Sequence, residues 1–469
     1  MQTERVRLPS TVLLLLAALL PGAAGAADPE LGLVDAVRQA LESNLDLAAR
    51  RRALAADREQ IGIARSTLLP QITVGARAQY LDDDRGNTGE RSATVGAGVT
   101  QVLYDESDWA GLDIQKQVYV QQEEQLEAFR LGVVQDAADA FLELDRARAL
   151  LDIQERNREL TARNLETSQA RIAAGWSSQR EVLRWESQLA SNDTDVVQAR
   201  TQVLVNRFEL NRVRNQPPEA PITPLPAEIE EYGFVYARKL IVDAIAKPEG
   251  DRRLRDLLVR VGLVRSPVLA AIDAALDAEH RQLTADKRAF WVPSLSLGAG
   301  IDHLAANSSS SGADFNETEW EVGAELTFPL LQGGAKFARL RQARESLASL
   351  RIERRAATEN IDQSVRAAFA QASGSYAELG YTQKQESAAR RNYELVYESY
   401  VLGVASILGL LDAQSQLLAA NQAVTDALYG FLEDLIAAEE QMAFYPFLAP
   451  ASEVTELLDR FERQLQTVP

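Results

Sequence analysis

The same series of segments occurs twice in this chain of 469 residues. LPQITVGA at 69–76 has a counterpart, VPSLSLGA, at 292–299. A repeat of this kind constrains the fold more than any single motif, because each copy must build the same unit. Further counterparts follow in the same order: VGAGVTQVLY at 95–104 and VGAELTFPLL at 322–331, then GWSSQREVLRWESQL at 175–189 and GVASILGLLDAQSQL at 403–417. Each half is therefore expected to contain a helix, two strands, a long helix, a tight turn and a second helix.

The two expected β-hairpins, at 69–104 and 292–331, limit the possible architectures. Apolar and polar residues alternate along 71–80 and 319–328, so each strand has one apolar face. Strands of this length match a tilted membrane crossing, which needs about 9–11 residues. Four strands cannot close a barrel, and a membrane tolerates no open sheet edge, so membrane strands would require several chains to share one barrel. The alternation alone equally fits a half-buried sheet in a soluble protein.

Two unusually long helices are expected at 105–173 and 335–402, where no proline interrupts sequences rich in Gln, Glu, Ala, Arg and Leu. Each would be about 100 Å long at 1.5 Å per residue. Shorter helices are expected at 177–213 and 406–441, where apolar and small residues follow a three-four spacing typical of coiled coils. An ordinary helical bundle would explain the spacing but not the length.

The ends and the middle of the chain do not belong to the repeat. Arg5 and Arg7, an apolar run at 11–20 and Ala24-Gly25-Ala26 predict a signal peptide at 1–26. The first repeat then covers 27–214 and the second 266–444. A proline-rich linker begins the region 215–265, and the tail at 445–469 contains a short amphipathic helix. These two segments are expected to pack together as a small mixed accessory domain.

Composition excludes several classes of function. The net charge of −19 disfavours a nucleic-acid partner, and the absence of cysteine leaves packing or assembly to stabilise an exported protein. No catalytic motif is present, so we expect no enzyme, and neither a cofactor nor a metal site is expected. His303 is expected at the start of a loop.

Two tight turns are the most distinctive candidate sites. Gly175 and Gly403 each follow a long helix, as a glycine in the left-handed conformation often does. Ser177 or Ser178 is expected to cap the helix after the first turn, and Ser406 the helix after the second. Each long helix should therefore turn back on itself.

Taken together, these segments resemble the outer membrane efflux protein family, the TolC-type exit ducts of Gram-negative bacteria. The resemblance rests on LPQITVGA and VPSLSLGA, on QVLYD and FPLLQGG before the long helices, and on the turns RIAAGWSSQREVL and YVLGVASILGLLDAQ. It implies an α+β membrane protein with an internal twofold repeat, in which a homotrimer in the outer membrane lipid shares a 12-stranded barrel. A long α-helical barrel would continue into the periplasm, with the accessory (equatorial) domain around its middle.

The resemblance also implies partners and a gate. The turns would face a periplasmic adaptor protein, which connects the duct to an inner-membrane pump. Asp412 matches an acidic ring of the family's periplasmic gate, and Tyr400 and Glu181 resemble a gate contact. Gly409 and Ala405 stand where members of the family often have an acid and an arginine, so those contacts are not expected here.

Two other functions fit parts of the sequence: a pump-independent outer-membrane pore and a soluble periplasmic coiled-coil scaffold. If the chain is a member of this family, its sequence is equally consistent with drug efflux, type I protein secretion and metal export.

Overall fold

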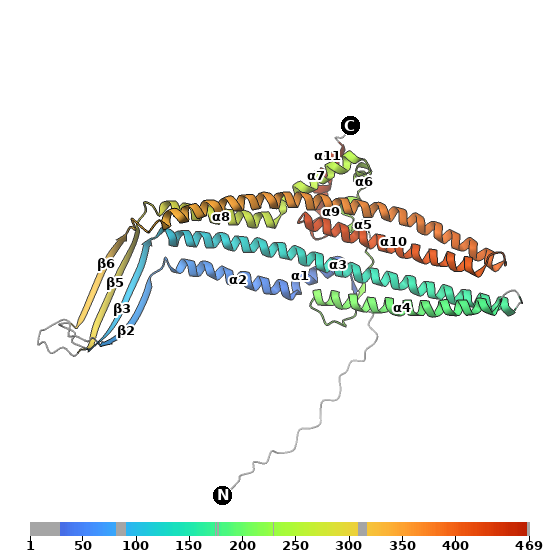
Figure 1. The fold of residues 1–469 in the computed structure, drawn as a ribbon, viewed down its shortest axis with the longest axis horizontal. Coiled ribbons are helices and arrows are strands. Elements are labelled where there is room, and N and C mark those ends of the chain that lie inside the picture. The colour runs from blue at the N-terminus through green and yellow to red at the C-terminus, as the bar shows by residue number, and fades with distance from the viewer. Residues whose placement is uncertain are drawn as a thin grey trace, which may run out of the picture.

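The computed structural model describes residues 29–80, 91–173, 175, 178–227, 229–307 and 317–466, so the expected signal peptide at 1–26 lies outside them. The protein is long and narrow, with a sheet at one end and helices that run from it to two turns at the other end (Figure 1). Its strands are β1 (Glu30–Leu31), β2 (Gln71–Tyr80), β3 (Arg91–Tyr104), β4 (Thr223–Pro224), β5 (Ser294–Asn307) and β6 (Thr318–Thr327). Its helices are α1 (Leu33–Ser43), α2 (Leu45–Ser66), α3 (Glu106–Ala173), α4 (Gln179–Val213), α5 (Ile229–Tyr232), α6 (Lys239–Ile245), α7 (Pro248–Arg265), α8 (Pro267–Arg288), α9 (Ala335–Val401), α10 (Ile407–Gln441) and α11 (Ala451–Gln466), with short 3-10 helices η2 (Phe234–Ala237) and η3 (Pro446–Leu448).

The four long strands form one antiparallel sheet in the order β2-β3-β5-β6. The central pair, β3 and β5, joins the two halves of the chain. Gly96 of β3 lies opposite Asp302 of β5, and a Cβ atom at this glycine would collide with the Asp302 carboxylate. Any larger residue at position 96 would therefore displace that side chain.

In the second hairpin, the C-terminal ends of β5 and β6 differ from the expected ones. His303 lies inside β5 rather than in a loop, because the strand continues to pair with β3 and the His303 ring contacts the Thr318 hydroxyl at 2.9 Å. β6 ends at Thr327, although the repeat extends the pattern to 331. Pro329 has no N–H group to donate to a strand, and Gly333 and Gly334 adopt positive φ angles that turn the chain into α9.

The long helices form a row. α3 and α9 contain 68 and 67 residues, which makes each about 100 Å long. Near the sheet, α3 packs between α2 and α8, and α8 also packs on α9. Toward the turns, α3 packs between α4 and α10, and α10 packs on α9. Figure 1 shows α4 and α9 at the two sides of this part of the row. No helix within the described ranges has the length and hydropathy of a membrane-spanning helix.

The main hydrophobic core lies halfway along the helices, where the linker region and the tail pack on them. Phe141 of α3 and Phe431 of α10 are fully buried there, together with Ile241 of α6 and Phe461 of α11. The ring of Tyr236 packs edge-on against Phe431, with centroids 5.1 Å apart. Full burial of each such side chain stabilises the fold by roughly 1.5–3 kcal/mol. Figure 1 shows α6, α7 and α11 gathered beside the middle of α9.

A buried carboxylate fastens the proline-rich linker to the long helices. Asp145 of α3 is 5% exposed and accepts hydrogen bonds from the Ala227 N–H at 3.0 Å and from the Tyr429 hydroxyl of α10 at 2.7 Å. Just before Ala227, β4 pairs in parallel with β1. The linker therefore connects the beginning of the described chain with both halves of the helical row.

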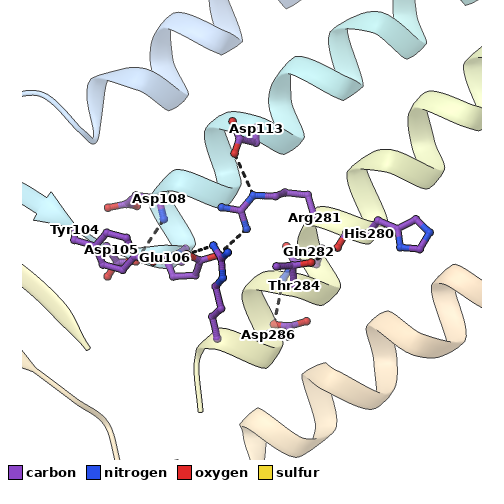
Figure 2. A network of polar contacts seen from close by, with 12 residues as sticks. Tyr104, Asp105, Glu106, Asp108, Asp113, His280, Arg281, Gln282, Thr284 and Asp286 are labelled. Atoms are coloured by element: carbon purple, nitrogen blue, oxygen red, sulfur yellow. Dashed lines mark hydrogen bonds and ion pairs between the residues drawn. The ribbon is translucent and has the colours of Figure 1, made fainter. Parts of the chain in front are cut away.

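A second buried carboxylate holds the junction between sheet and helices (Figure 2). Glu106, in the first turn of α3, pairs with Arg281 at 2.7 Å and with Arg288 at 3.2 Å, and both arginines belong to α8. Arg281 also pairs with Asp113 at 3.1 Å, and the Tyr104 hydroxyl donates to Glu106 at 2.6 Å. Burial by itself would raise the pKa of Glu106, but the hydrogen bonds from Tyr104 and Arg281 and the nearby positive charge outweigh burial and lower it.

We expect Glu106→Gln to weaken this junction by about 2 kcal/mol, because hydrogen bonds to charged groups contribute roughly 1.5–3 kcal/mol. Folding lowers the pKa of Glu106. Its contribution to stability is therefore present when the pH is above the pKa of this group in the unfolded chain, and it is lost as the pH falls through the pKa in the folded protein. Thermal unfolding in detergent at pH 7 and pH 3 measures both effects. In the control Glu159→Gln, which breaks an exposed pair with Arg163, the change should stay below about 0.5 kcal/mol. Equal effects of the two variants would contradict this account.

Candidate functional site at the helix turns

The two turns at the far end of the helices have nearly the same backbone conformation. Gly175 and Gly403 adopt φ angles of +78° and +79°, where a side chain would be strained. The Gly175 N–H donates to the Ile172 carbonyl at 2.9 Å, and the Gly403 N–H donates to the Tyr400 carbonyl at 3.0 Å. These bonds give partners to main-chain carbonyl groups in the last turns of α3 and α9.

The serines after the turns behave differently. The Ser406 hydroxyl accepts a hydrogen bond from the Gly409 N–H at 3.2 Å and caps α10 as expected. Ser178 occupies the position before α4, but its side chain makes no capping bond. The Glu181 N–H instead donates to the Ser178 main-chain carbonyl at 2.9 Å, so the expected capping role of this hydroxyl is wrong. Ser177 lies outside the described residues.

Tyr400, in the last turn of α9, connects the two helical hairpins close to the turns. It is 1% exposed, and its hydroxyl donates to Glu181 of α4 at 3.2 Å. The contact between Tyr400 and Glu181 that the family resemblance implies is thus present. Tyr400 belongs to one buried hydrophobic cluster with Trp185 of α4 and with Ile407 and Leu410 of α10. Side chains from both halves of the chain therefore form one cluster.

Arg171 completes this cluster and was not identified from the sequence. Its guanidinium carbon lies 4.5 Å from the centre of the Tyr400 ring, and Nη1 donates to the Tyr400 carbonyl. Arg171 belongs to α3, so it brings a positive charge to Tyr400 from the other hairpin. A basic residue in the last turn of α3 is the only signal in the sequence, and it could equally have been explained by the helix dipole.

Asp412 lies on the exposed side of α10, in the second turn of this helix. Its carboxylate accepts a hydrogen bond from Gln416 at 2.8 Å, one turn further along the same helix. The side chain is therefore open to solvent, whereas Tyr400 is buried. Three such carboxylates around an axis would form a negatively charged ring.

A buried polar layer lies farther from the turns, at the level of Asn164 and Gln414. The Gln414 amide nitrogen donates to Asn157 at 2.9 Å and to Thr161 at 2.6 Å, and its oxygen accepts from Asn164 at 2.9 Å. Thr161 also accepts from Asn192 of α4 at 2.7 Å, and Asn164 contacts the Tyr393 hydroxyl of α9 at 3.3 Å. All four helices of this region meet in the layer. We call these six residues the polar layer: Asn157, Thr161, Asn164, Asn192, Tyr393 and Gln414.

The second turn also exposes apolar side chains. Leu402 is 79% exposed, Val404 82% and Leu408 59%. Exposed apolar residues that cluster at one end of a molecule are typical of surfaces that bind another protein.

Both halves of the chain match one protein-family model. The model, described as outer membrane efflux protein, matches residues 36–215 and 258–438. The outer membrane protein TolC of Salmonella enteritidis is 26% identical over 415 residues, which cover 85% of this chain and 79% of the relative.

Solved structures share the fold. The channel CusC superimposes with a TM-score of 0.73 at 18% identity, covering 87% of this chain and 91% of CusC. The CmeC outer membrane channel of Campylobacter jejuni gives a TM-score of 0.70 at 16% identity, covering 92% of this chain and 89% of CmeC.

Proposed function

Because the chain belongs to the outer membrane efflux protein family, we propose that three copies form the exit duct of a tripartite efflux or type I secretion system. The family resemblance is confirmed, and with it the location in the outer membrane of a Gram-negative bacterium, with the helical part in the periplasm. In the proposed complex, substrate passes from an inner-membrane pump through the periplasm to the exterior.

The observation that carries the proposal is the open, apolar-faced sheet. β2 and β6 each contain 10 residues and pair on one side only within the described part of the chain. On one face of these edge strands Ile72, Val74 and Trp320 are each 77% exposed. Such a face is favourable in lipid, but open edges are not, because each unpaired backbone group there costs several kcal/mol. Pairing of β6 with β2 of the next chain removes both edges, and three chains give 12 strands.

The detergent-corrected mass of the protein extracted from membranes tests this proposal. We expect a mass of three chains and a hollow, elongated particle. A single chain that is soluble without detergent would contradict the proposal and would favour a periplasmic scaffold.

The exposed apolar turn favours a pump-linked duct over a pump-independent pore. We propose that the turns around Gly175, Ser178, Gly403 and Ser406 face a periplasmic adaptor protein. Val404→Asp should then reduce export at least about tenfold, because a charge buried in such a contact costs several kcal/mol. The control Glu398→Asp, an exposed conservative change on α9, should leave export unchanged. Unimpaired export by Val404→Asp, with the three-chain mass retained, would favour the pump-independent pore.

We propose that the Tyr400, Glu181 and Arg171 cluster keeps the turns together in the closed duct, and that Asp412 contributes a negatively charged ring at the entrance. Rings of carboxylates favour cations. Asp412→Asn should therefore lower the ratio of cation to anion permeability by at least about twofold, as measured by the reversal potential in a planar bilayer under a salt gradient. Glu186→Gln, on an exposed position of α4, is the matched control. An unchanged reversal potential and unchanged block by divalent cations would exclude this role for Asp412.

A further inference from the structure

The segment between β6 and α9, residues 328–334, exposes two consecutive leucines. Leu331 is 87% exposed, more than any other large apolar side chain that the structure describes, and Leu330 is 82% exposed. A single exposed leucine is normal on a protein surface, but two adjacent ones at the end of an exposed apolar sheet face extend a patch. In the proposed duct this segment directly follows a strand that crosses the membrane.

A buried lysine fixes this segment to the end of α8. Lys336, in the first turn of α9, is 8% exposed, and its ammonium group donates to the Ala289 carbonyl at 2.7 Å and to the Pro329 carbonyl at 2.5 Å. The same ammonium group lies 5.1 Å from the centre of the Phe328 ring and 6.0 Å from that of Phe290. Carbonyl oxygens and aromatic faces both compensate for the burial of a cation. The two leucines therefore project from a segment that is held on both sides.

Aromatic side chains extend this apolar surface. Phe337 of α9 is 59% exposed, and its ring packs edge-on against Phe290, with centroids 5.0 Å apart. Trp291, the residue after Phe290, is 67% exposed, and tryptophan is typical of membrane–water interfaces. Figure 1 shows that the connections from α8 to β5 and from β6 to α9 both lie at the helical end of the sheet. We call the exposed members of this surface the apolar rim: Trp291, Phe328, Leu330, Leu331 and Phe337.

The beginning of α9 is strongly basic. Its first ten residues, 335–344, contain four cations and no acid, in a chain whose net charge is −19. Arg339, Arg341 and Arg344 are exposed, and none of them forms an ion pair or a side-chain hydrogen bond with a residue that the structure describes. Farther along the same helix, Arg354 pairs with a carboxylate of α8. We call the three unpaired cations the junction arginines.

This charge does not stabilise the helix by itself. The N-terminus of a helix carries a partial positive charge and favours Asp or Glu, as in the first turns of α2, α3, α4 and α7. The first turn of α9 contains Lys336 and no acid. Arg341 and Arg344 are three positions apart, so their like charges are neighbours on the helix surface. Both features fit an anionic partner outside this chain.

The apolar rim and the junction arginines lie at successive distances from the sheet. β6 ends at Thr327, and α9 rises by about 10 Å between Phe337 and Arg344. A headgroup layer is about 5–8 Å thick on each side of the hydrocarbon, and arginine can extend its charged end into that layer. If the sheet spans the hydrocarbon, the apolar rim lies at its periplasmic boundary and the junction arginines lie within reach of the headgroups.

A neighbouring copy is the other possible occupant of this surface, and its charge does not fit. In the proposed ring β6 pairs with β2 of the next copy, so the nearest helix end belongs to α2. The last six residues of α2, 61–66, contain Arg65 and no acid. Like charges would then face each other, whereas a phosphate group matches the paired donors of a guanidinium group. The surface therefore fits lipid better than a second copy of this chain.

We propose that the apolar rim inserts into the periplasmic leaflet of the outer membrane and that Arg339, Arg341 and Arg344 bind the phosphate groups of anionic phospholipids there. This inference rests on the proposed membrane barrel and specifies the lipid class that contacts the protein at its lower edge. Lys336 holds the segment of the rim in place and contacts no lipid itself.

Native mass spectrometry of the natural protein in detergent tests the headgroup contact. The probe is an equimolar mixture of phosphatidylglycerol and phosphatidylcholine with the same acyl chains. We expect the protein to retain phosphatidylglycerol at least about fivefold more than phosphatidylcholine, because cations close to a membrane surface attract anionic lipid. The triple variant Arg339→Gln, Arg341→Gln and Arg344→Gln should lose most of this preference.

A second triple variant is the matched control for charge. Arg156→Gln, Arg163→Gln and Arg390→Gln change the net charge equally, at positions that are 70%, 64% and 59% exposed and lie farther from the sheet. This variant should keep the preference of the natural protein. Equal retention of both lipids by the natural protein, or an equal loss of preference in the two triple variants, would overturn the headgroup contact.

Fluorescence quenching tests the insertion of the rim, because the natural chain contains no cysteine and a single one can be labelled. Leu331→Cys and the control Asn360→Cys, exposed on α9 farther from the sheet, carry a fluorophore in nanodiscs of phosphatidylethanolamine and phosphatidylglycerol. We expect phospholipid brominated on its acyl chains to quench position 331 at least about threefold more than position 360, and iodide to show the reverse order. Equal quenching by iodide would overturn insertion, as would protection of position 331 from both quenchers, which a neighbouring copy would cause.

The detergent-corrected mass of the natural protein separates these failures from a failure of the proposed function. A three-chain mass together with any of these contrary results would leave the duct intact and overturn only the lipid contact. A single-chain mass would overturn the proposed function, and with it the membrane level on which this inference rests.

Discussion

Replacing Gln414 by leucine should loosen the contact between the two helical hairpins by about 3 kcal/mol, which corresponds to roughly 100-fold faster local opening. The amide of Gln414 is 4% exposed and bonds to Asn157, Thr161 and Asn164, all three of which are buried. Leucine has a similar size but leaves these groups without their shared partner. A buried polar group that loses its partner costs roughly 1–3 kcal/mol.

Amide hydrogen exchange of peptides from α3 and α10 measures this effect locally. Gln416→Leu is the matched control, because Gln416 lies exposed on the same helix, and its side chain bonds to the exposed Asp412. We expect faster exchange around Asn164 in Gln414→Leu and an unchanged rate in Gln416→Leu. Equal protection in the two variants would mean that the polar layer contributes nothing to holding the hairpins together.

The polar layer also determines how the hairpins are aligned. An apolar seam tolerates small shifts of one helix along another, whereas a buried hydrogen-bonded side chain fits at one position only. The layer lies between the Tyr400 cluster and the main core, so it separates the short region next to the turns from the larger core in the middle of the molecule. Opening of the turns would therefore require motion mainly beyond this level.

Replacing Glu439 by leucine should stabilise the middle of the protein by about 2 kcal/mol at pH 8, because a buried polar group without a hydrogen-bond partner costs roughly 1–3 kcal/mol, and more when it is charged. Glu439 of α10 is 1% exposed, and neither carboxylate oxygen has a hydrogen-bond partner among the residues that the structure describes. Burial alone raises its pKa well above the usual value. The side chain is therefore buried as a neutral acid or at a large cost as an anion.

The pH dependence follows from the direction of this shift. A carboxyl group whose pKa is raised by folding contributes fully below its unfolded pKa and loses that contribution as the pH rises through the folded value. Burial likewise raises the pKa of Asp139 to about 6 and that of Glu433 to about 7. The thermal unfolding temperature of the natural protein should thus decrease as the pH rises from 5 to 8.

Thermal unfolding of Glu439→Leu and Glu439→Gln across this pH range tests the prediction. Both variants should reduce the loss of stability at high pH, and only leucine should also raise the midpoint at pH 5. Glu359→Gln, at a position that is 68% exposed, should follow the natural protein at every pH. A leucine variant that is less stable than the natural protein at pH 8 would show that Glu439 has a partner in the assembled protein.

Much of the architecture follows from local patterns. The alternation in 71–80 and 319–328, the absence of proline in the long helices and the three-four spacing after each turn are properties of short stretches. They predict the strands and the helices to within a few residues, because side chains two or three to four positions apart share a face whatever the rest of the chain does. The turn glycines belong to the same class, since a positive φ angle is a local requirement.

The candidate site was only partly predictable. Tyr400 and Glu181 were found through the resemblance to a family, whereas Arg171, Gln414 and Glu439 were not found at all. Gln414 lies beside the apolar seam of Leu410, Ala413 and Leu417, where a polar residue suggests a solvent-exposed position, although it is buried. Its partners belong to α3, in the other half of the chain, and no local pattern encodes a contact over such a separation.

The sequence by itself determined the elements, their repeated order and the faces on which apolar residues lie. The tertiary structure alone decided which helices lie side by side, and therefore which polar groups share a buried layer and which apolar side chains remain exposed. The physical reason is that periodicity acts between neighbours in one helix or strand, whereas burial and hydrogen bonding between helices depend on the packing of the whole row.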